Sequence, residues 1–383
     1  MAEDLDDDID ALISELNASA PRAAGAPAAG DRVLRLELLL AETIRRGGSD
    51  LLLVSGSAPA IRVDGSLVRV DGPALDDGDV EEIVLPMMPP HARRQFADAG
   101  IADASLRLPS LGRFRLNLHR ERGRPAAAIR ALPSRVPRLA DLDLPPEIDG
   151  LSRVQRGLVL IGGATGSGKT TTLAALVDEI NRRDAKHVIT VEDPIEYEHA
   201  NALGLVEHVE IGVDAPDYPT ALRAAERQAP DVLVIGEMRD PESMRIALAA
   251  AETGHLVLSS LHTTDVASTI ARIADSFPNE RQNTIRQELS LALSAVVTQT
   301  LIPLAGGGRV PAAEVLVVGY GARQHIRKNA LQHLHQEITL TRRHGSLTLE
   351  DSLARLVRAG RIPKAEALAR AGHPDELESI LKD

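Results

Sequence analysis

A glycine-rich segment that follows an apolar run constrains this chain more than any other feature of its sequence. Residues 158–161 form a short apolar run of the kind that makes a buried strand. Residues 163–170 then fit the pattern G-x-x-x-x-G-K-[ST], which describes a loop that cradles phosphate groups. A helical stretch follows at residues 173–182. The sequence therefore predicts a strand, a phosphate-binding loop and a helix in direct succession.

The residue types in this loop suit an anion. Glycines allow backbone N–H groups to converge on it, and the helix that follows adds the positive end of its dipole. We expect Lys169 to reach the β- and γ-phosphates and Thr170 to ligate Mg²⁺. A chance match in a Gly/Ser linker is the alternative, and the flanking strand and helix argue against it. The full set of nucleotide-binding candidates in the loop is Gly163, Ala164, Thr165, Gly166, Ser167, Gly168, Lys169, Thr170 and Thr171.

Carboxylates follow the next predicted strand, at residues 187–191. Glu192, Asp193 and Glu196 lie close together directly after it. Such a group is poorly suited to a core and well suited to holding Mg²⁺ or polarising a water molecule. We therefore take Glu192 as a catalytic and metal-binding candidate, and a solvated acidic loop is the alternative.

A further acid follows the third predicted strand, at residues 232–235. Gly236 stands where an Asp commonly ends such a strand, and Glu237 comes next. Phosphoryl transfer needs positioning and charge neutralisation more than covalent help. Glu237 is thus a candidate for acting on the attacking water or on the water shell of the metal. Its alternative role is a surface ion pair with Arg239.

Two histidines flank the fourth predicted strand, at residues 256–260. His262 ends that strand and is followed by two threonines at the end expected to face the ligand. We therefore predict that His262 senses the phosphate. His255 precedes the strand, and for this residue a catalytic and a structural role are equally supported.

Strand and helix patterns alternate through the middle of the chain, which predicts a parallel sheet with helices on both faces. Ligands of such sheets bind beyond the carboxyl ends of the strands, where the motifs above are located. An α+β module is expected before this domain, with a helix at 34–46 and strands at 51–54, 60–63, 67–70 and 112–119. The predicted organisation is a tail and linker at 1–30, the α+β domain at 31–146, the α/β domain at 147–320 and a C-terminal helical region at 321–383.

The first residues form an acidic tail. Residues 1–17 are rich in Asp and Glu, although leucines and isoleucines recur among them at helical spacing. Residues 18–30 have the Ala, Pro and Gly composition of a linker. We expect a disordered, solvated tail, and the alternative is a short amphipathic helix that docks into the groove of a partner.

Composition excludes several classes of function. The chain contains no cysteine, which rules out disulfides, thiol catalysis and Cys-ligated zinc. No apolar run has membrane-spanning length and the N-terminus does not resemble a signal peptide, so we expect a cytoplasmic protein without direct membrane insertion. A net charge of -12 and 2% aromatic residues argue against nucleic acid as a partner.

The motifs, in this order and spacing, resemble those of the secretion and type IV pilus ATPase family. The resemblance extends over roughly residues 33–360 and implies a RecA-like P-loop ATPase domain preceded by a PAS-like domain and followed by C-terminal helices. The matching segments are 163–170 for the phosphate loop, 189–196 for the Asp box, 236–240 for an atypical Walker B motif, 250–264 for the His box, and 49–53, 62–65 and 113–117 for the PAS-like domain.

Within the family, the chain is most similar to the pilus-retraction branch. Met238 stands where assembly and secretion ATPases more often have Ile, and their tetracysteine zinc element is absent. Residues 347–353 resemble a Thr-Leu-Asp-x-Ser-Leu stretch of the retraction enzymes, and residues 326–329 loosely resemble another of their motifs. Residues 206–212 depart from the family pattern because they lack its Gln-Arg pair.

The resemblance implies a homohexameric motor that hydrolyses ATP to power pilus retraction and twitching motility. ATP would bind between the two domains and across a subunit boundary, with Glu192 and Glu237 sharing water activation and the Mg²⁺ shell. Arg113 and Arg115 are candidates for an arginine that a neighbouring subunit supplies. The implied partners are a platform protein of the inner membrane, at whose cytoplasmic face the ring would lie, and a paralogous ATPase.

Three alternatives remain open at this point. The chain could be a pilus-assembly or type II secretion ATPase, although the missing cysteines argue against it. It could be an accessory ring subunit with weak motor activity, which the lost Gln-Arg pair favours. A nucleic-acid motor is disfavoured by acidity and scarce aromatics.

Overall fold

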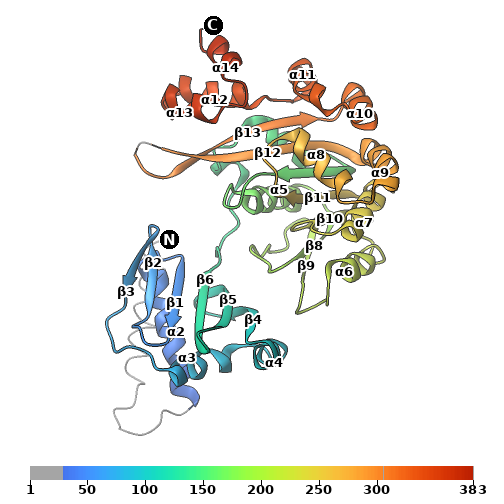
Figure 1. The fold of residues 1–383 in the computed structure, drawn as a ribbon. Coiled ribbons are helices and arrows are strands. Elements are labelled where there is room, and N and C mark those ends of the chain that lie inside the picture. The colour runs from blue at the N-terminus through green and yellow to red at the C-terminus, as the bar shows by residue number, and fades with distance from the viewer. Residues whose placement is uncertain (1–28, 305, 383) are drawn as a thin grey trace. The chain divides into compact units, whose positions relative to one another are not determined.

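The computed structural model describes residues 29–304 and 306–382, and it divides into two compact units (Figure 1). One unit ends at Ser134 and the other begins at Arg135. The predictions for the acidic tail and for most of its linker concern residues 1–28 and lie outside the described residues. The linker was expected to extend to residue 30, but the first described helix, α2 (Ala29–Arg45), already begins at residue 29.

The first unit is an antiparallel sheet with helices, as the α+β prediction requires. Its six strands run in the order β3-β2-β1-β6-β5-β4. Their apolar side chains form one core with α2 and the helices α3 (Asp77–Val84) and α4 (Pro90–Ala99). The strands are β1 (Asp50–Val54), β2 (Ala60–Val63), β3 (Ser66–Arg69), β4 (Ile101–Leu108), β5 (Gly112–Glu121) and β6 (Arg124–Ala131).

Strand β5 confirms the alternation expected at residues 112–119. Phe114, Leu116 and Leu118 are fully buried, whereas the residues between them are partly or wholly exposed. A side-chain period of two places one set of residues on the core face of a sheet and the other set on the opposite face. Arg113 and Arg115 therefore lie on the face of β5 that points away from this core.

The second unit contains a seven-stranded sheet in the order β13-β12-β7-β11-β10-β8-β9. Every neighbouring pair is parallel except β12 and β13, which form an antiparallel hairpin. The strands are β7 (Gly157–Gly162), β8 (His187–Glu192), β9 (Leu205–Glu210), β10 (Val232–Ile235), β11 (Leu256–Leu261), β12 (Leu293–Pro303) and β13 (Arg309–Val317).

Helices cover both faces of this sheet, as predicted. Alternate residues of the same strand enter different cores: Leu158 and Leu160 of β7 pack in one cluster, and Val159 and Ile161 in the other. This double burial explains why the parallel strands read as continuous apolar runs. One face carries α5 (Lys169–Arg183), and the other carries α6 (Tyr218–Ala225), α7 (Pro241–Glu252), α8 (Val266–Asp275) and α9 (Asn279–Ala292).

The division between the units falls after Ser134, near the start of the Pro-rich segment at 133–146, whereas the sequence placed the domain boundary at the end of that segment. Two 3-10 segments, η2 (Leu139–Asp141) and η3 (Pro146–Arg153), belong to the second unit. Leu139 of η2 and Ile148 of η3 are buried in the core that covers α5. The segment is thus part of the α/β unit because its apolar side chains have a place in that core.

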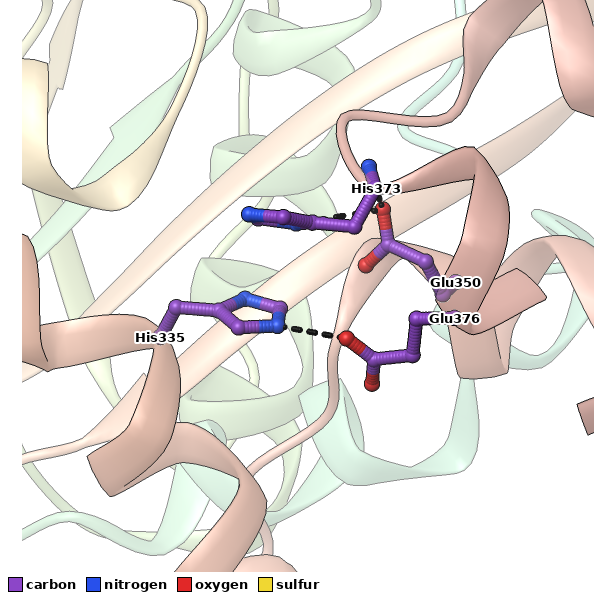
Figure 2. Close-up of side chains that lie close together, drawn as sticks. All are labelled: His335, Glu350, His373 and Glu376. Atoms are coloured by element: carbon purple, nitrogen blue, oxygen red, sulfur yellow. Dashed lines mark hydrogen bonds and ion pairs between the residues drawn. The ribbon is translucent and has the colours of Figure 1, made fainter. Parts of the chain in front are cut away.

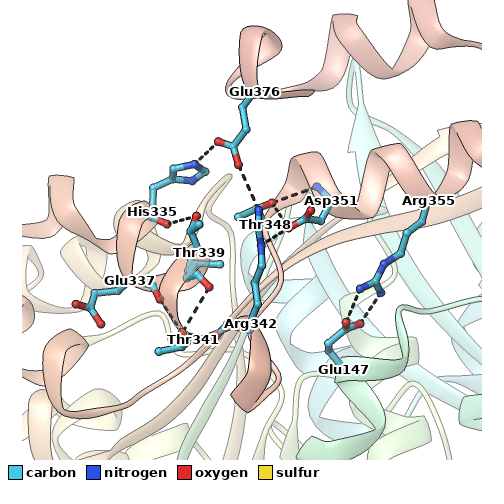
Figure 3. A network of polar contacts seen from close by, with 12 residues as sticks. Glu147, His335, Glu337, Thr339, Thr341, Arg342, Thr348, Asp351, Arg355 and Glu376 are labelled. Atoms are coloured by element: carbon cyan, nitrogen blue, oxygen red, sulfur yellow. Dashed lines mark hydrogen bonds and ion pairs between the residues drawn. The ribbon is translucent and has the colours of Figure 1, made fainter. Parts of the chain in front are cut away.

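Short helices end the chain, as expected for the region from residue 321. Several of them pack against the β12–β13 hairpin, where Leu353 and Leu377 are buried with Ile302 and Val310. Polar contacts add to this packing, for instance Arg355, whose guanidinium lies 2.7 Å from Glu147 of η3 (Figure 3). The elements are α10 (Tyr320–Arg327), η4 (Leu331–His333), α11 (Leu334–Leu340), η5 (Arg342–His344), α12 (Leu349–Arg358), α13 (Lys364–Arg370) and α14 (Pro374–Ile380).

Within the part of the chain that the structure describes, no helix combines the length and apolar character that crossing a membrane requires.

Candidate active site

The phosphate-loop motif joins the end of β7 to the start of α5. Gly168 caps α5 in the left-handed region, with φ of 89°, and Gly163 has φ of 153°. A Cβ atom at Gly163 would come within 2.3 Å of Ser167 Oγ and 2.6 Å of the Gln299 carbonyl oxygen. Glycine is therefore required at this position by space as well as by backbone conformation.

The Lys169 side chain folds back over the loop. Its ammonium donates hydrogen bonds to the carbonyl oxygens of Gly163, at 2.9 Å, and Ala164, at 3.0 Å. Only 7% of Lys169 is exposed. Burial lowers the pKa of this lysine, although the nearby Glu237 and Glu196 carboxylates act in the opposite direction. The two hydrogen bonds thus hold the Lys169 side chain against the phosphate loop.

His262 connects Lys169 to Glu237. The Lys169 Nζ atom lies 3.3 Å from His262 Nδ1, and His262 Nε2 lies 3.3 Å from Glu237 Oε1. Because an ammonium only donates, Nδ1 accepts and the proton of a neutral imidazole is on Nε2, where it faces the carboxylate. The predicted phosphate sensor is therefore in contact with both the predicted phosphate ligand and a predicted catalytic acid.

Glu237 also takes part in the ion pair that was its alternative role. The Arg239 guanidinium lies 2.9 Å from Glu237 Oε2, and it lies 3.9 Å from Asp193 Oδ2. One carboxylate oxygen thus faces His262 and the other faces Arg239. The two roles considered for Glu237 do not exclude each other.

Glu192 ends β8 beside the start of α5. With Thr170, Tyr197, His199 and Gly236 it lines a small cavity. One Glu192 oxygen accepts the backbone N–H of Glu196 at 3.4 Å. The structure therefore brings the predicted metal ligand Thr170 and the predicted acid Glu192 to the same place.

Two histidines that the sequence did not single out stand behind Glu192. His208 Nδ1 lies 2.8 Å from Thr190 Oγ1 and 3.8 Å from Glu192 Oε1. The backbone N–H of His199 donates to His208 Nε2 at 3.0 Å, so a neutral His208 has its proton on Nδ1. Burial, together with the neighbouring His208, lowers the pKa of His199 to about 4. The His199 ring is therefore neutral at neutral pH.

Gln299 of β12 is a site residue that sequence reasoning missed. Its amide donates to the Ser167 carbonyl at 2.7 Å and accepts from Thr172 Oγ1 at 2.9 Å. It therefore ties the loop to the first turn of α5. A buried glutamine in an apolar strand was the available signal, because buried polar groups in proteins are as a rule hydrogen-bonded.

Within the second unit, His255 does not join the other predicted site residues. His255 lies before β11, at the amino ends of the parallel strands, and its carbonyl accepts the N–H of Gly157 at 2.9 Å. The structure thus separates His255 from the phosphate loop of its own chain. Arg113 and Arg115 belong to the first unit, where Arg113 donates to Ser105 Oγ at 2.8 Å. Their action on a neighbouring subunit remains a prediction.

The loop has the properties of a site for a phosphate. The buried Ser167 hydroxyl is one of three buried side-chain groups, among the described residues, that lack a hydrogen-bond partner. An anion in the loop would give that hydroxyl an acceptor. Thr170, Glu192 and Glu237 supply the oxygen donors that Mg²⁺ prefers. The donor set therefore fits a nucleotide with its magnesium ion.

The strand, loop, helix and facing acids define a P-loop ATPase. A comparison with family models gives a match to the family described as type II/IV secretion system protein, over residues 104–362. The chain belongs to that family.

Comparisons with individual proteins find pilus ATPases among the chains that this one is similar to. The type IV pilus retraction ATPase PilT of Pseudomonas aeruginosa is 40% identical over 339 residues, which cover 88% of this chain and 98% of PilT. The type IV pilus ATPase PilU of the same organism is 35% identical over 91% of this chain and 92% of its own length. A crystal structure of the pilus retraction motor PilT with bound ADP matches with a TM-score of 0.82 and 39% identity, over 90% of this chain and 98% of that one.

Proposed function

We propose that this chain is an ATP-hydrolysing motor that powers type IV pilus retraction. The observation that carries the proposal is the connection from Lys169 through His262 to Glu237 beside a phosphate loop. The likeness to PilT over nearly its whole length supports the particular process.

Binding begins at the loop. Backbone N–H groups of the loop and of the first turn of α5 surround the phosphates, and Lys169 moves from its carbonyl contacts to the β- and γ-phosphates. Thr170, with Glu192 and Glu237, would hold Mg²⁺, which supplies charge neutralisation at the phosphates. Gln299 keeps the loop in register with α5 while these contacts form.

Hydrolysis then depends on the acids around the γ-phosphate. Glu237 and Glu192 orient the attacking water, and one of these two carboxylates accepts the single proton that the water releases. When Lys169 turns to a phosphate, His262 loses its contact at Nδ1 and keeps the one to Glu237 through Nε2–H. The state of the γ-phosphate is thereby transmitted to the acid through a single imidazole.

Mechanical work requires a larger assembly. We propose a homohexameric ring at the cytoplasmic face of the inner membrane, in which Arg113 or Arg115 of one subunit neutralises charge at the site of its neighbour. Nucleotide-dependent rotation of one unit against the other would be a rigid-body switch of a known kind. A platform protein in the membrane would receive the motion.

An accessory ring subunit that works with a catalytic paralogue is the second candidate. His208, in the segment 206–212 that departs from the family pattern, lies 3.8 Å from Glu192. The segment that departs from the family pattern therefore lies next to Glu192, one of the two proposed catalytic acids. The similarity to PilU agrees with this alternative.

Pilus retraction in cells whose sole copy carries Lys169→Ala tests the proposal. We expect retraction to be lost, and Lys364→Ala, at an exposed lysine of α13, to retain it. Retraction that survives with Lys169→Ala as the sole copy would exclude this chain as the motor.

A further inference from the structure

Four side chains that can ligate a metal meet among the C-terminal helices, away from the phosphate loop. His335 comes from α11, Glu350 from α12, His373 from the N-cap of α14, and Glu376 from its first turn. One ligand atom from each lies within 4.8 Å of every other (Figure 2). We propose that this cluster is a binding site for a divalent transition metal, with Zn²⁺ as the ion that it fits best.

The chemistry of the four ligands supports zinc. Imidazole nitrogens and carboxylate oxygens both bind Zn²⁺, whereas Ca²⁺ and Mg²⁺ prefer oxygen ligands alone. Bonds of about 2.0–2.2 Å in a tetrahedral site set the ligand atoms about 3.3–3.6 Å apart. His335 Nε2 and Glu376 Oε2 are 2.7 Å apart, and His373 Nδ1 and Glu350 Oε1 are 3.6 Å apart. Because all four ligand atoms lie within 4.8 Å of one another, small side-chain rotations would bring them to bonding distance of one ion.

Charge gives a second, independent reason. Glu350 is only 1% exposed, and the backbone N–H of His373 donates to it at 2.8 Å. A buried carboxylate needs a compensating positive charge. The His335 and His373 rings, with centroids 3.9 Å apart, bring their nitrogens to the same pair of carboxylates. A divalent ion held by the four side chains would supply the positive charge that the buried Glu350 carboxylate needs.

Outer contacts hold one of the ligands in place. The Arg342 guanidinium lies 2.7 Å from Asp351 and 3.5 Å from Glu376 Oε1 (Figure 3). Arg342 therefore contacts Oε1 of Glu376, whereas His335 contacts Oε2. Such second-shell partners orient the ligands of metal sites. Glu376 is thus positioned to offer Oε2 to an ion.

A metal at this place would join three helices that are separate in sequence. α11, α12 and α14 would be linked by coordination bonds across residues 335–376. Closing so long a segment removes conformational freedom from the unfolded chain, which is how metal clips stabilise a fold. We therefore expect the ion to fasten the C-terminal helices to one another and not to act on ATP.

Zinc binding by the tag-free, full-length chain tests this proposal. The protein is freed of metal with a chelator, and Zn²⁺ is then titrated in competition with a chromophoric chelator. We expect about one tightly bound Zn²⁺ per chain, at least tenfold weaker binding in His335→Ala and in His373→Ala, and unchanged binding in His344→Ala. His344 is an exposed histidine of the same region.

Two further measurements keep the result unambiguous. Glu237→Gln should bind the same amount of Zn²⁺, because the expected ion is not at the active site. Zinc should raise the melting temperature of the wild type and of His344→Ala, but not of the conservative ligand variant Glu376→Gln. No bound Zn²⁺ at micromolar concentration, or equal affinity in His335→Ala and the wild type, would overturn the proposal.

Discussion

Replacement of Gln299 by Met is the most informative single perturbation of the loop. Met has a similar volume, so the change removes the amide without opening a cavity. Two hydrogen bonds are lost, but they differ in consequence. Thr172 is in a helix, and its hydroxyl can turn to the carbonyl oxygen four residues earlier. The Ser167 carbonyl, which accepts the Gln299 amide at 2.7 Å, has no such substitute.

The expected magnitude follows from that difference. An acceptor left unsatisfied in a buried place costs about 1–3 kcal/mol. Since about 1.4 kcal/mol equals a factor of ten in an equilibrium constant, this cost on the binding-competent loop should weaken ATP binding by about 5- to 140-fold. Equilibrium titration with a fluorescent ATP analogue measures this change directly.

Two matched variants separate the loop from general stability. Gln332→Met alters an exposed glutamine of η4 and should leave affinity unchanged. Gln299→Glu keeps an acceptor for Thr172 but removes the donor to Ser167 and adds a negative charge, so it should bind ATP more weakly than Gln299→Met. If folded Gln299→Met binds ATP within twofold of the wild type, the claim that Gln299 orders the loop is wrong.

Three more predictions address the loop, the histidine pair and the first unit. Gly163→Ala should abolish nucleotide binding by isothermal titration because its Cβ has no space, whereas Gly306→Ala, which has open space, should bind normally. His199 is neutral in the fold and has a pKa of about 4 against 6.5 when unfolded, so stability should fall by up to about 3 kcal/mol as pH drops from 6.5 to 4. This loss of stability should be smaller in His199→Phe than in the control His344→Phe when thermal melting is measured at each pH. Equal dependence of the melting temperature on pH in the two variants would refute the assignment to His199. Phe114→Ala should cost about 3–5 kcal/mol in chemical unfolding, because the ring is fully buried; a cost below 1 kcal/mol would contradict the packing.

Elements with a strong local pattern were predictable from sequence. β7, β8, β10 and β11 are apolar runs that end in glycine, an acid or a histidine, and the structure confirms all four. Their parallel order also accounts for why the residues at their carboxyl ends meet. Asp64 and Gly65 form the turn between β2 and β3, and both have positive φ, as an Asp-Gly hairpin turn requires.

Other strands carry a weaker signal for physical reasons. Alanines provide the buried positions at 126–127 of β6 and at 102 and 104 of β4, so their apolar contrast is small. Polar residues within β12, including Thr298 and Gln299, interrupt its apolar pattern because they serve the loop and the neighbouring side chains.

The candidate active site was likewise predictable from the sequence only in part. The loop and the acids could be found from motifs, but the contact between His262 and Lys169 depends on β11 lying next to β7. His255, seven positions before His262, falls at the other end of the same strand. The cluster of His335 with Glu376 arises from the packing of separate short helices, which no local pattern encodes.

ATP turnover by the purified full-length chain beside Glu237→Gln, with the mass of the oligomer recorded in the same samples, tests the central claim most directly. The matched control is Glu280→Gln, at an exposed acid of α9. We predict hexamers that hydrolyse ATP, equal turnover in the control, and loss of turnover with ATP binding retained in Glu237→Gln. Intact hexamers that bind ATP without hydrolysing it, or wild-type turnover in Glu237→Gln, would contradict a self-sufficient motor built around this acid.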